Sequence, residues 1–236
     1  MAPKREKKKK QKKVEISIEP FPGADQVYCY DATKTYTYFN YIISIGDDRS
    51  IFCTFGYNYQ AIADWLVDIQ HIYRRHRHYL LVGVSLDSQL NKKGGPSAGH
   101  PYTVLTLCIG SHCLNIFLGW DDKLPKPFRD FLHNPAVFFV GVDMEKKKRK
   151  LEADRGVVLR KVVDLLPVAE ESLGKKIFPR WLHNVAGAVL GEEYEVEKPE
   201  RVKMCDYEDR DMLPEQVKYS CFEAFLAFEI GKKILI

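Results

Sequence analysis

The stretch Leu80-Leu81-Val82-Gly83-Val84-Ser85-Leu86-Asp87 decides the fold class. It is a mostly apolar run, which is typical of a strand that is buried on both faces of a sheet. Residues 87–101 are polar and contain Gly94-Gly95-Pro96, so a loop is expected there. Along the rest of the chain, further short apolar segments alternate with segments of helical periodicity. This alternation predicts an α/β layered domain.

The predicted elements are distributed over most of the chain. Strands are expected at residues 35–39, 50–55, 79–86, 102–109, 113–118 and 136–142, and helices at residues 59–74, 125–132, 145–154, 158–173, 178–190 and 214–233. Their order predicts a central mixed β-sheet flanked by helices on both faces. We divide the chain into a disordered basic tail (1–13), an N-terminal β-rich extension (14–57) and a main domain (58–236).

The positive charge of the chain is concentrated in its first residues. Residues 1–13 contain eight Lys or Arg and one Glu, while the whole chain carries a net charge of +4, so the remainder is acidic by three charges. Such a tail is too charged and too poor in apolar residues to fold. It predicts a nuclear-import signal, a nucleic-acid tether or a merely solvated tail. We therefore expect the protein in the nucleus, the cytoplasm or both.

Several function classes are disfavoured by composition. No apolar run is long enough to span a bilayer, and no apolar segment follows the basic N-terminus as in a signal peptide. The six cysteines form no C-x-x-C pair, and most lie in apolar contexts, so buried reduced thiols are expected. The seven histidines show no zinc-binding spacing.

From Leu80 onward the chain resembles the 3′–5′ exonucleases of the Werner/RNase D type, the DEDDy class with a ribonuclease H-like fold, and particularly the plant members. The segments that carry this resemblance, in order, are residues 81–87, 104–110, 139–142, 163–165, 182–191, 205–207 and 212–224. Each segment alone is weakly specific, but together they keep the order and spacing of the family. The resemblance covers about two thirds of the chain and implies a ribonuclease H-like exonuclease fold.

The resemblance also implies a two-metal site, which this chain keeps only as a remnant. Family members hydrolyse phosphodiesters with two Mg²⁺ or Mn²⁺ ions held by four acids, and a tyrosine orients the attacking water. Carried over by motif, the acids fall on Ser85, Asp87, Lys147 and Glu223, and the tyrosine on Tyr219. Asp87, Glu223 and Tyr219 are therefore the candidate catalytic residues, and Asp87 and Glu223 the candidate metal ligands.

Lys147 is the most damaging of these replacements. A protonated ammonium cannot bind Mg²⁺ and repels it, so we expect it to pair with Asp87 or Glu223 instead. A shift by one residue still places a cation there, because Lys146 and Lys148 flank it. The nearby acids Asp143 and Glu145 could replace it only if the strand–helix junction changed register.

Basic residues beside this site are candidates for contact with nucleic acid. They are Lys146, Lys148, Arg149 and Lys150, and a second basic cluster follows at residues 74–78. Either run could contact phosphates or simply form a solvated face.

Three functions remain open from the sequence. The first is a nucleic-acid-binding protein of the exonuclease family with lost or very weak hydrolysis, a pseudo-nuclease without a metal cofactor. The second is an active Mg²⁺- or Mn²⁺-dependent 3′–5′ exonuclease on DNA or RNA. The third is a non-catalytic subunit that assembles with itself or with active relatives. The chemistry of Ser85 and Lys147 favours the first.

Overall fold

The computed structural model describes residues 12–22, 29–31, 34–36, 38–56, 59–74, 79–88, 101–118, 124–203 and 212–236. Of the predicted basic tail, only Lys12 and Lys13 are described. Most of the predicted loop at residues 87–101 and all of the motif segment at residues 205–207 lie outside the described residues.

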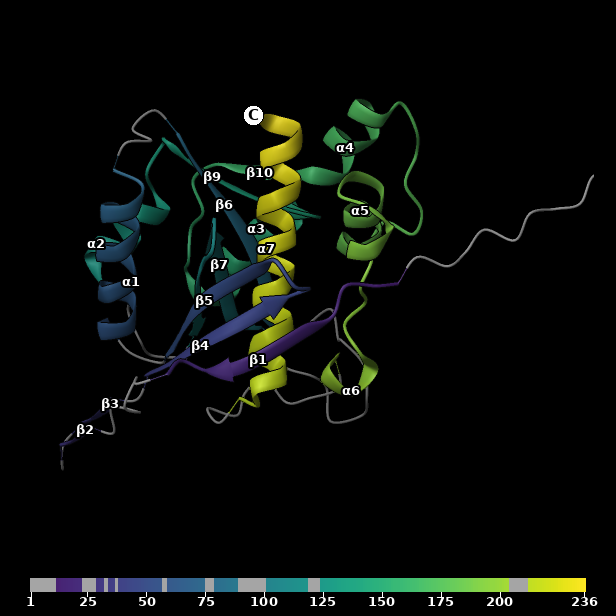
Figure 1. Cartoon of the computed structure of the whole chain (residues 1–236). Coiled ribbons are helices and arrows are strands. Elements are labelled where there is room, and N and C mark those ends of the chain that lie inside the picture. Colours follow the sequence, from purple (N-terminus) through teal and green to yellow (C-terminus); the bar gives the residue numbers. More distant parts are fainter. Residues whose placement is uncertain are drawn as a thin grey trace, which may run out of the picture.

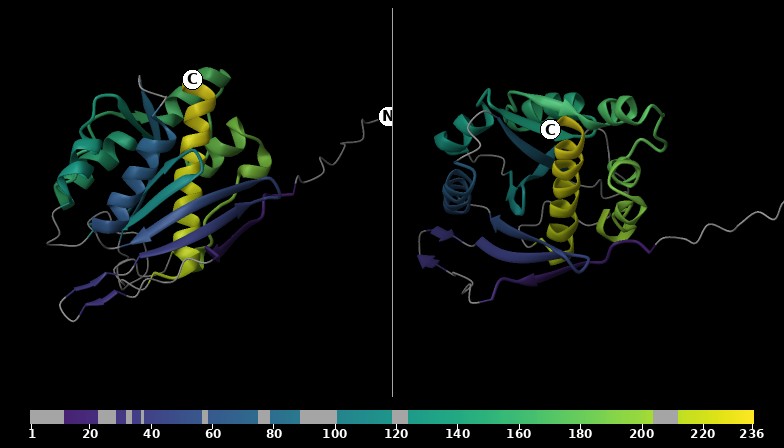
Figure 2. Two further views of the ribbon diagram at one scale, coloured as in Figure 1. Left: turned by 60° about the vertical axis from the view of Figure 1, so that its left-hand side comes forward. Right: turned by 45° about the horizontal axis from the view of Figure 1, so that its top comes forward.

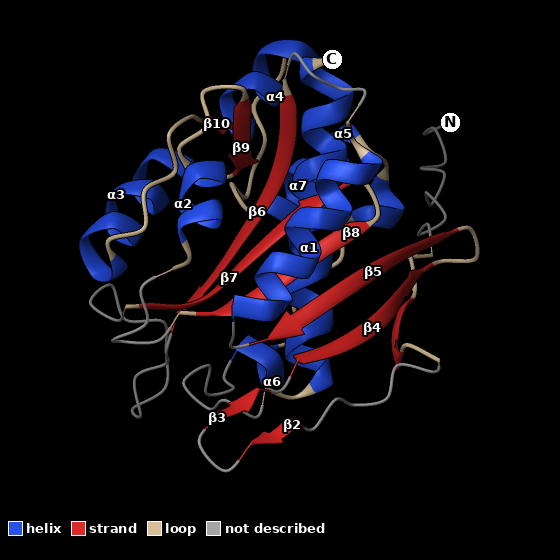
Figure 3. Cartoon of the chain, turned by 90° about the vertical axis from the view of Figure 1, so that its left-hand side faces the viewer, coloured by secondary structure: helices blue, strands red, loops and turns tan. Residues whose placement is uncertain are grey.

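One mixed sheet of eight strands organises the protein (Figures 1 and 3). In spatial order the strands are β1 (Ile16–Pro20), β4 (Tyr38–Ile45), β5 (Arg49–Gly56), β8 (His112–Phe117), β7 (Tyr102–Ile109), β6 (Leu80–Ser88), β9 (Val137–Gly141) and β10 (Val162–Asp164). The pairs β5–β8, β6–β9 and β9–β10 are parallel, and the other four are antiparallel. The strands β2 (Cys29–Asp31) and β3 (Lys34–Tyr36) form a separate two-stranded sheet.

Helices cover both faces of the large sheet. The helices α1 (Tyr59–Ile72), α2 (Lys126–Leu132) and α3 (Met144–Arg155) share one apolar core, and α4 (Leu165–Leu173), α5 (Leu182–Val189) and α7 (Pro214–Leu235) share the other. Figure 2 shows α7 lying along the sheet, with α4 and α5 beside it. The predicted ribonuclease H-like arrangement of a mixed sheet between two helical layers is confirmed. None of the described helices is both long and apolar enough to cross a membrane.

The prediction of a single helix at residues 158–173 was wrong in its first half. Val162 to Asp164 form β10, which pairs in parallel with β9, and the helix begins only at Leu165. Two adjacent β-branched valines favour a strand, and the Asp164 carboxylate accepts a hydrogen bond from the Leu166 N–H as a helix cap. The helix predicted from residue 178 likewise begins later, at Leu182.

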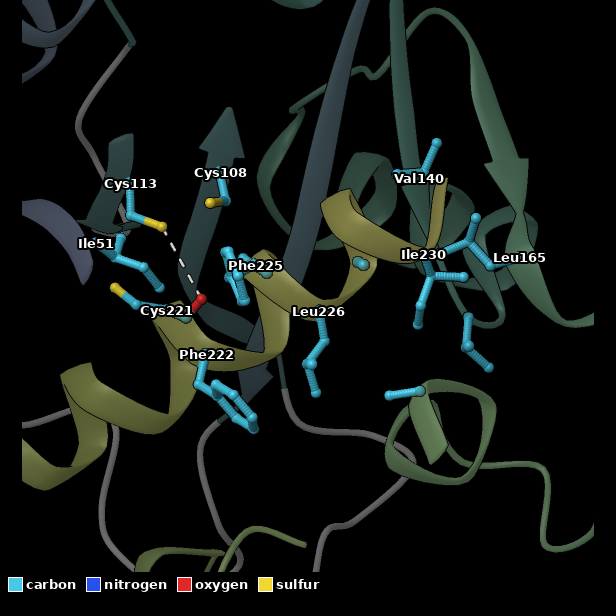
Figure 4. Packing of buried hydrophobic residues seen from close by; sticks show 14 of the residues in the cluster. Ile51, Cys108, Cys113, Val140, Leu165, Cys221, Phe222, Phe225, Leu226 and Ile230 are labelled. Atoms are coloured by element: carbon cyan, nitrogen blue, oxygen red, sulfur yellow. Dashed lines mark hydrogen bonds between the residues drawn. The ribbon is translucent and has the colours of Figure 1, made fainter. Parts of the chain in front are cut away.

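The strand β6 and the helix α7 approach each other closely at Gly83. A Cβ atom at Gly83 would lie 2.0 Å from the Ala224 carbonyl oxygen and 2.6 Å from the Phe228 nitrogen. Only glycine allows the two backbones to come this near. Figure 4 shows Phe222, Leu226 and Ile230 of α7, which belong to the buried core on this side of the sheet. The acid-bearing strand and the last helix are therefore held in a fixed relation.

Four of the six cysteines lie in this core as buried free thiols: Cys53, Cys108, Cys113 and Cys221. Cys53, Cys113 and Cys108 lie side by side on three neighbouring strands. The Cys113 thiol lies 3.9 Å from the Cys221 carbonyl oxygen (Figure 4), and the sulfurs of Cys221 and Cys53 are 3.2 Å apart. The prediction of buried reduced thiols is confirmed for these four.

The predicted β-rich N-terminal segment contributes three strands to the large sheet. β1, β4 and β5 come from residues 14–57, and β5 pairs with β8 from Phe52 to Gly56. The two sides of the division at residue 57 therefore belong to one sheet. Two further short elements, η1 (Glu192–Tyr194) and α6 (Glu200–Lys203), follow α5 in the segment predicted to be irregular.

Candidate functional site

A cleft of about 590 Å³ opens at the carboxyl end of β6. Ser85 and Asp87 enter it from β6, Lys147 from α3 and Glu223 from α7. The structure therefore brings together all four positions to which the sequence motifs assign acids. The opposite side of the cleft is formed by the N-terminal end of α5 and by the connection that follows α5. Its lining residues include Trp181, His183, Lys198 and Lys203.

A lysine that the sequence analysis missed occupies the space between the two carboxylates. Lys198 Nζ lies 2.7 Å from Asp87 Oδ1 and 3.1 Å from Glu223 Oε2. The side chains of Lys198 and Asp87 are 8% and 10% exposed, so this ion pair is shielded from water. Burial strengthens the attraction between the charges and makes either charge costly without its partner.

Two serines complete the hydrogen bonding of the carboxylates. Ser220 donates to Asp87 Oδ2 at 2.5 Å, and Ser85 donates to Glu223 Oε2 at 2.9 Å. Asp87 thus has a charged partner on one oxygen and a hydroxyl on the other. Ser85, at a position assigned to an acid, acts as a neutral donor to the remaining glutamate. Both oxygens of Asp87 and one oxygen of Glu223 thus have protein partners.

Lys147 faces the same cleft but is not the residue that pairs with the acids. Burial lowers the pKa of Lys147, and the carboxylates of Glu223, Asp143 and Asp87 oppose this shift. Lys147 nevertheless forms no ion pair with the carboxylates of the described residues. The expectation that Lys147 pairs with Asp87 or Glu223 was wrong, because Lys198 already occupies the position between them.

Tyr219 keeps its place on α7 but is not among the residues that line the cleft. It is half-buried, and Lys218 Nζ lies 5.1 Å from the centre of its ring. Burial raises the pKa of Tyr219. The neighbouring Ser220, which no motif had singled out, reaches Asp87 instead.

Comparison with known proteins supports the resemblance to 3′–5′ exonucleases. A 3′-5′ exonuclease of Arabidopsis thaliana is 21% identical over 152 residues, which are 64% of this chain and 51% of that protein. Escherichia coli RNase D, an exoribonuclease involved in structured RNA processing, superposes with a TM-score of 0.56 at 11% identity, over 75% of this chain and 42% of that one.

Brucella melitensis NrnC, solved bound to pGG, superposes with a TM-score of 0.53 at 10% identity, over 66% of this chain and 72% of that one. The fold is that of the 3′–5′ exonucleases of the RNase D type. No protein-family model matches the chain. The chain spans about half the length of the Arabidopsis protein.

The residues of this exonuclease fold do not fit a two-metal site. Divalent Mg²⁺ or Mn²⁺ needs several oxygen ligands arranged around an open position. Here an ammonium lies within 3.1 Å of both remaining carboxylates, and the position of a third acid is held by Ser85. Among the described residues no group of three or more His, Cys, Asp or Glu side chains is arranged to hold a metal ion.

One further acid lies at the cleft of this exonuclease fold. Asp143 lines it and precedes α3 with a φ of 58°, in the left-handed region that non-glycine residues seldom adopt. Glu145, named with it from the sequence, is not among the lining residues. The Asp143 carboxylate is one of the groups that oppose the lowering of the Lys147 pKa.

The predicted basic run is only partly available to a ligand. Lys150 pairs with Asp154, and Lys148 donates to the Arg160 carbonyl oxygen at 3.4 Å. Lys146 and Arg149 are exposed. These two are the most exposed of the four predicted contact residues, but neither lines the cleft, and Arg149 Nε donates to the Glu145 carbonyl oxygen at 3.2 Å.

Proposed function

We propose that this protein binds nucleic acid through an exonuclease fold whose capacity to hydrolyse phosphodiesters is lost or very weak. The observation that carries the proposal is the position of Lys198 between Asp87 and Glu223. An internal ammonium there supplies the positive charge that bound metal ions supply in an active site of this type. Unlike a metal, it cannot activate a water molecule for attack.

The surrounding residues support the same conclusion. Ser85 and Lys147 stand where the motifs assign acids, and both face the cleft. Recruiting a metal would require Lys198 to leave a buried ion pair, which costs several kcal/mol for each uncompensated charge. The packing of the site as well as its sequence therefore supports the proposed loss of hydrolysis.

Binding of nucleic acid is supported by the fold and by exposed cations on α3, the helix that carries Lys147 into the cleft. Lys146 and Arg149 are these exposed cations, and NrnC, of similar fold, was solved bound to pGG. The test is a titration of labelled single-stranded DNA and RNA at two salt concentrations. Because phosphate contacts release counterions, the affinity should fall at least about tenfold between 50 and 200 mM salt. Salt-independent binding, or no binding, would overturn the proposal.

An active Mg²⁺- or Mn²⁺-dependent exonuclease is the alternative that the fold suggests. A degradation assay with Mn²⁺ should compare wild type with Asp87→Ala and Glu223→Ala. We expect no degradation above background in any of the three. Degradation by wild type that both substitutions abolish would establish the active enzyme instead. Equal degradation by all three would indicate contamination or a different site.

Assembly and location extend the proposal. Light scattering should distinguish a monomer from a self-assembled form. A strict monomer that also binds no nucleic acid would support neither self-assembly nor nucleic-acid binding. For location, residues 1–13 carry seven net positive charges. Fused to a fluorescent reporter, they are expected to direct it to the nucleus, and an unchanged distribution would leave the tail as a solvated segment.

A further inference from the structure

The connection between α4 and α5 exposes two large aromatic side chains beside the cleft. Phe178 is 73% exposed and Trp181 is 62% exposed, within four consecutive residues. Figure 1 shows this connection bowing outward from the two helices. Exposed apolar surface that is contiguous and rimmed by polar residues can mark an interaction site. Trp181 also lines the cleft, so the exposed surface is continuous with it.

The backbone that carries these rings is fixed at both ends. Glu170 accepts hydrogen bonds from Lys176 Nζ at 2.8 Å and from the Ile177 N–H at 3.0 Å, and the Ile177 side chain is buried. At the other end, the Trp181 carbonyl oxygen accepts from the N–H groups that begin α5. A ligand that stacks on the rings therefore needs to order little backbone on binding.

Cations alternate with the aromatic residues along the same connection. Lys175 and Arg180 are both exposed, and neither forms an ion pair with a described residue. Lys176 is neutralised by Glu170, which leaves Lys175 and Arg180 as accessible positive charges beside Phe178 and Trp181. Rings that offer flat apolar faces, interleaved with cations, match a partner that has flat bases and anionic phosphates.

We infer that residues 175–181 form a stacking surface for single-stranded nucleic acid, with bases on Phe178 and Trp181 and phosphates at Lys175 and Arg180. This inference rests on the proposed function, and it identifies the surface that holds the bound single-stranded nucleic acid. Stacking on aromatic side chains needs unpaired bases, since the faces of bases in a duplex are already covered. The surface therefore selects single strands over duplexes with little regard to base sequence, and it operates without a metal.

The test is a fluorescence titration of labelled single-stranded and duplex oligonucleotides with the full chain. Phe178→Ala and Trp181→Ala should each weaken single-strand binding about tenfold, and Phe178→Trp should retain it. Lys175→Glu with Arg180→Glu should weaken binding and reduce its salt dependence. The matched control is Tyr79→Ala, an exposed aromatic residue at the other end of β6. It should bind like wild type.

The outcomes separate this inference from the proposed function. If wild type binds single strands and the two aromatic variants bind equally well, the stacking surface is refuted while nucleic-acid binding stands. If wild type binds no oligonucleotide, both the proposed function and this inference fail. If Tyr79→Ala weakens binding as strongly as Phe178→Ala, the effect is not specific to this surface. Equal affinity for duplex and single strand would also overturn it.

Discussion

Lys198 and Asp87 form an ion pair of 2.7 Å in which both side chains are almost fully buried. Removing the cation leaves the buried Asp87 carboxylate with the Ser220 hydroxyl as its neutral donor. Lys198→Met should therefore lower the free energy of unfolding by about 3–5 kcal/mol, measured in urea. Lys203→Ala is the control, because Lys203 pairs with Glu197 and Glu200 near the surface and should cost about 1 kcal/mol or less. Equal effects of the two substitutions would contradict a buried role for Lys198.

Restoring acids at the four motif positions should restore metal binding only when Lys198 is replaced as well. Ser85→Asp, Asp87→Glu, Lys147→Asp and Glu223→Asp recreate the acid set implied by the family motifs. We expect this fourfold variant to bind Mn²⁺ poorly and the same variant with Lys198→Ala to bind it well, since Lys198 otherwise competes for the carboxylates.

The measurement is the loss of the free Mn²⁺ signal in electron paramagnetic resonance, with wild type as the control. Strong Mn²⁺ binding by wild type would show that Lys198 does not block the site. A fourfold variant that binds Mn²⁺ equally with and without Lys198 would lead to the same conclusion.

The contact between β6 and α7 makes Gly83 sensitive to the smallest enlargement. Its added Cβ would meet backbone atoms of α7 at 2.0 and 2.6 Å, which cannot move aside as side chains do. Gly83→Ala should lower the free energy of unfolding by about 3 kcal/mol or more, or prevent folding. At Gly231, by contrast, the new atom meets the side-chain ends of Leu81 and Val140 at 3.0 and 3.1 Å.

Gly231→Ala should thus be much less harmful, because those side chains can shift and alanine favours the helix by about 1 kcal/mol. Thermal unfolding of the two variants in parallel provides the comparison. A Gly83→Ala protein as stable as Gly231→Ala would mean that the two layers are further apart than the structure shows.

The stability of the connection that carries Phe178 should depend on pH through Glu170. Hydrogen bonds from Lys176 and the Ile177 N–H lower the pKa of Glu170. A lowered folded-state pKa gives a contribution that is fully present above the unfolded value of about 4.3 and is lost as pH falls through the folded value. Wild type should therefore be more stable than Glu170→Gln at pH 7, and the difference should vanish in acid.

Melting temperatures from pH 7 to pH 3 test this, with the exposed neighbour Glu171→Gln as the control. Glu171→Gln should follow wild type at every pH. A constant difference between wild type and Glu170→Gln across the range would show that the charge of Glu170 is not what stabilises the connection.

The strands and the gathering of the acid positions could be predicted because local pattern and motif order carry that information. Ser85 and Asp87 share one buried strand, and Glu223 lies on a long amphipathic helix, so both elements were recognisable. The β10 strand was not, since Val162 to Asp164 form only three residues directly before a helix. Its strand character depends on β9, to which it pairs.

Lys198 could not be predicted for a different reason. It lies between α5 and α6, in a segment without periodicity or a motif, and it is 111 residues from Asp87. Nothing local indicates where such a side chain points. The one available signal was electrostatic, because two neighbouring carboxylates at a partly buried site need a compensating cation. That argument predicted a cation beside Asp87 and Glu223 and assigned it to Lys147 rather than to Lys198.

The pairing of β5 with β8 limits how the chain can be shortened. Residues 58–236 contain all the recognised motifs and would be the natural choice for a smaller protein. Without β5, however, the β8 backbone would lose its neighbour from His112 to Ile116, and the apolar strand would become an open edge. Open apolar edges recruit strands from other molecules. A protein trimmed to its recognisable part should therefore aggregate, and soluble preparations need the first strands as well.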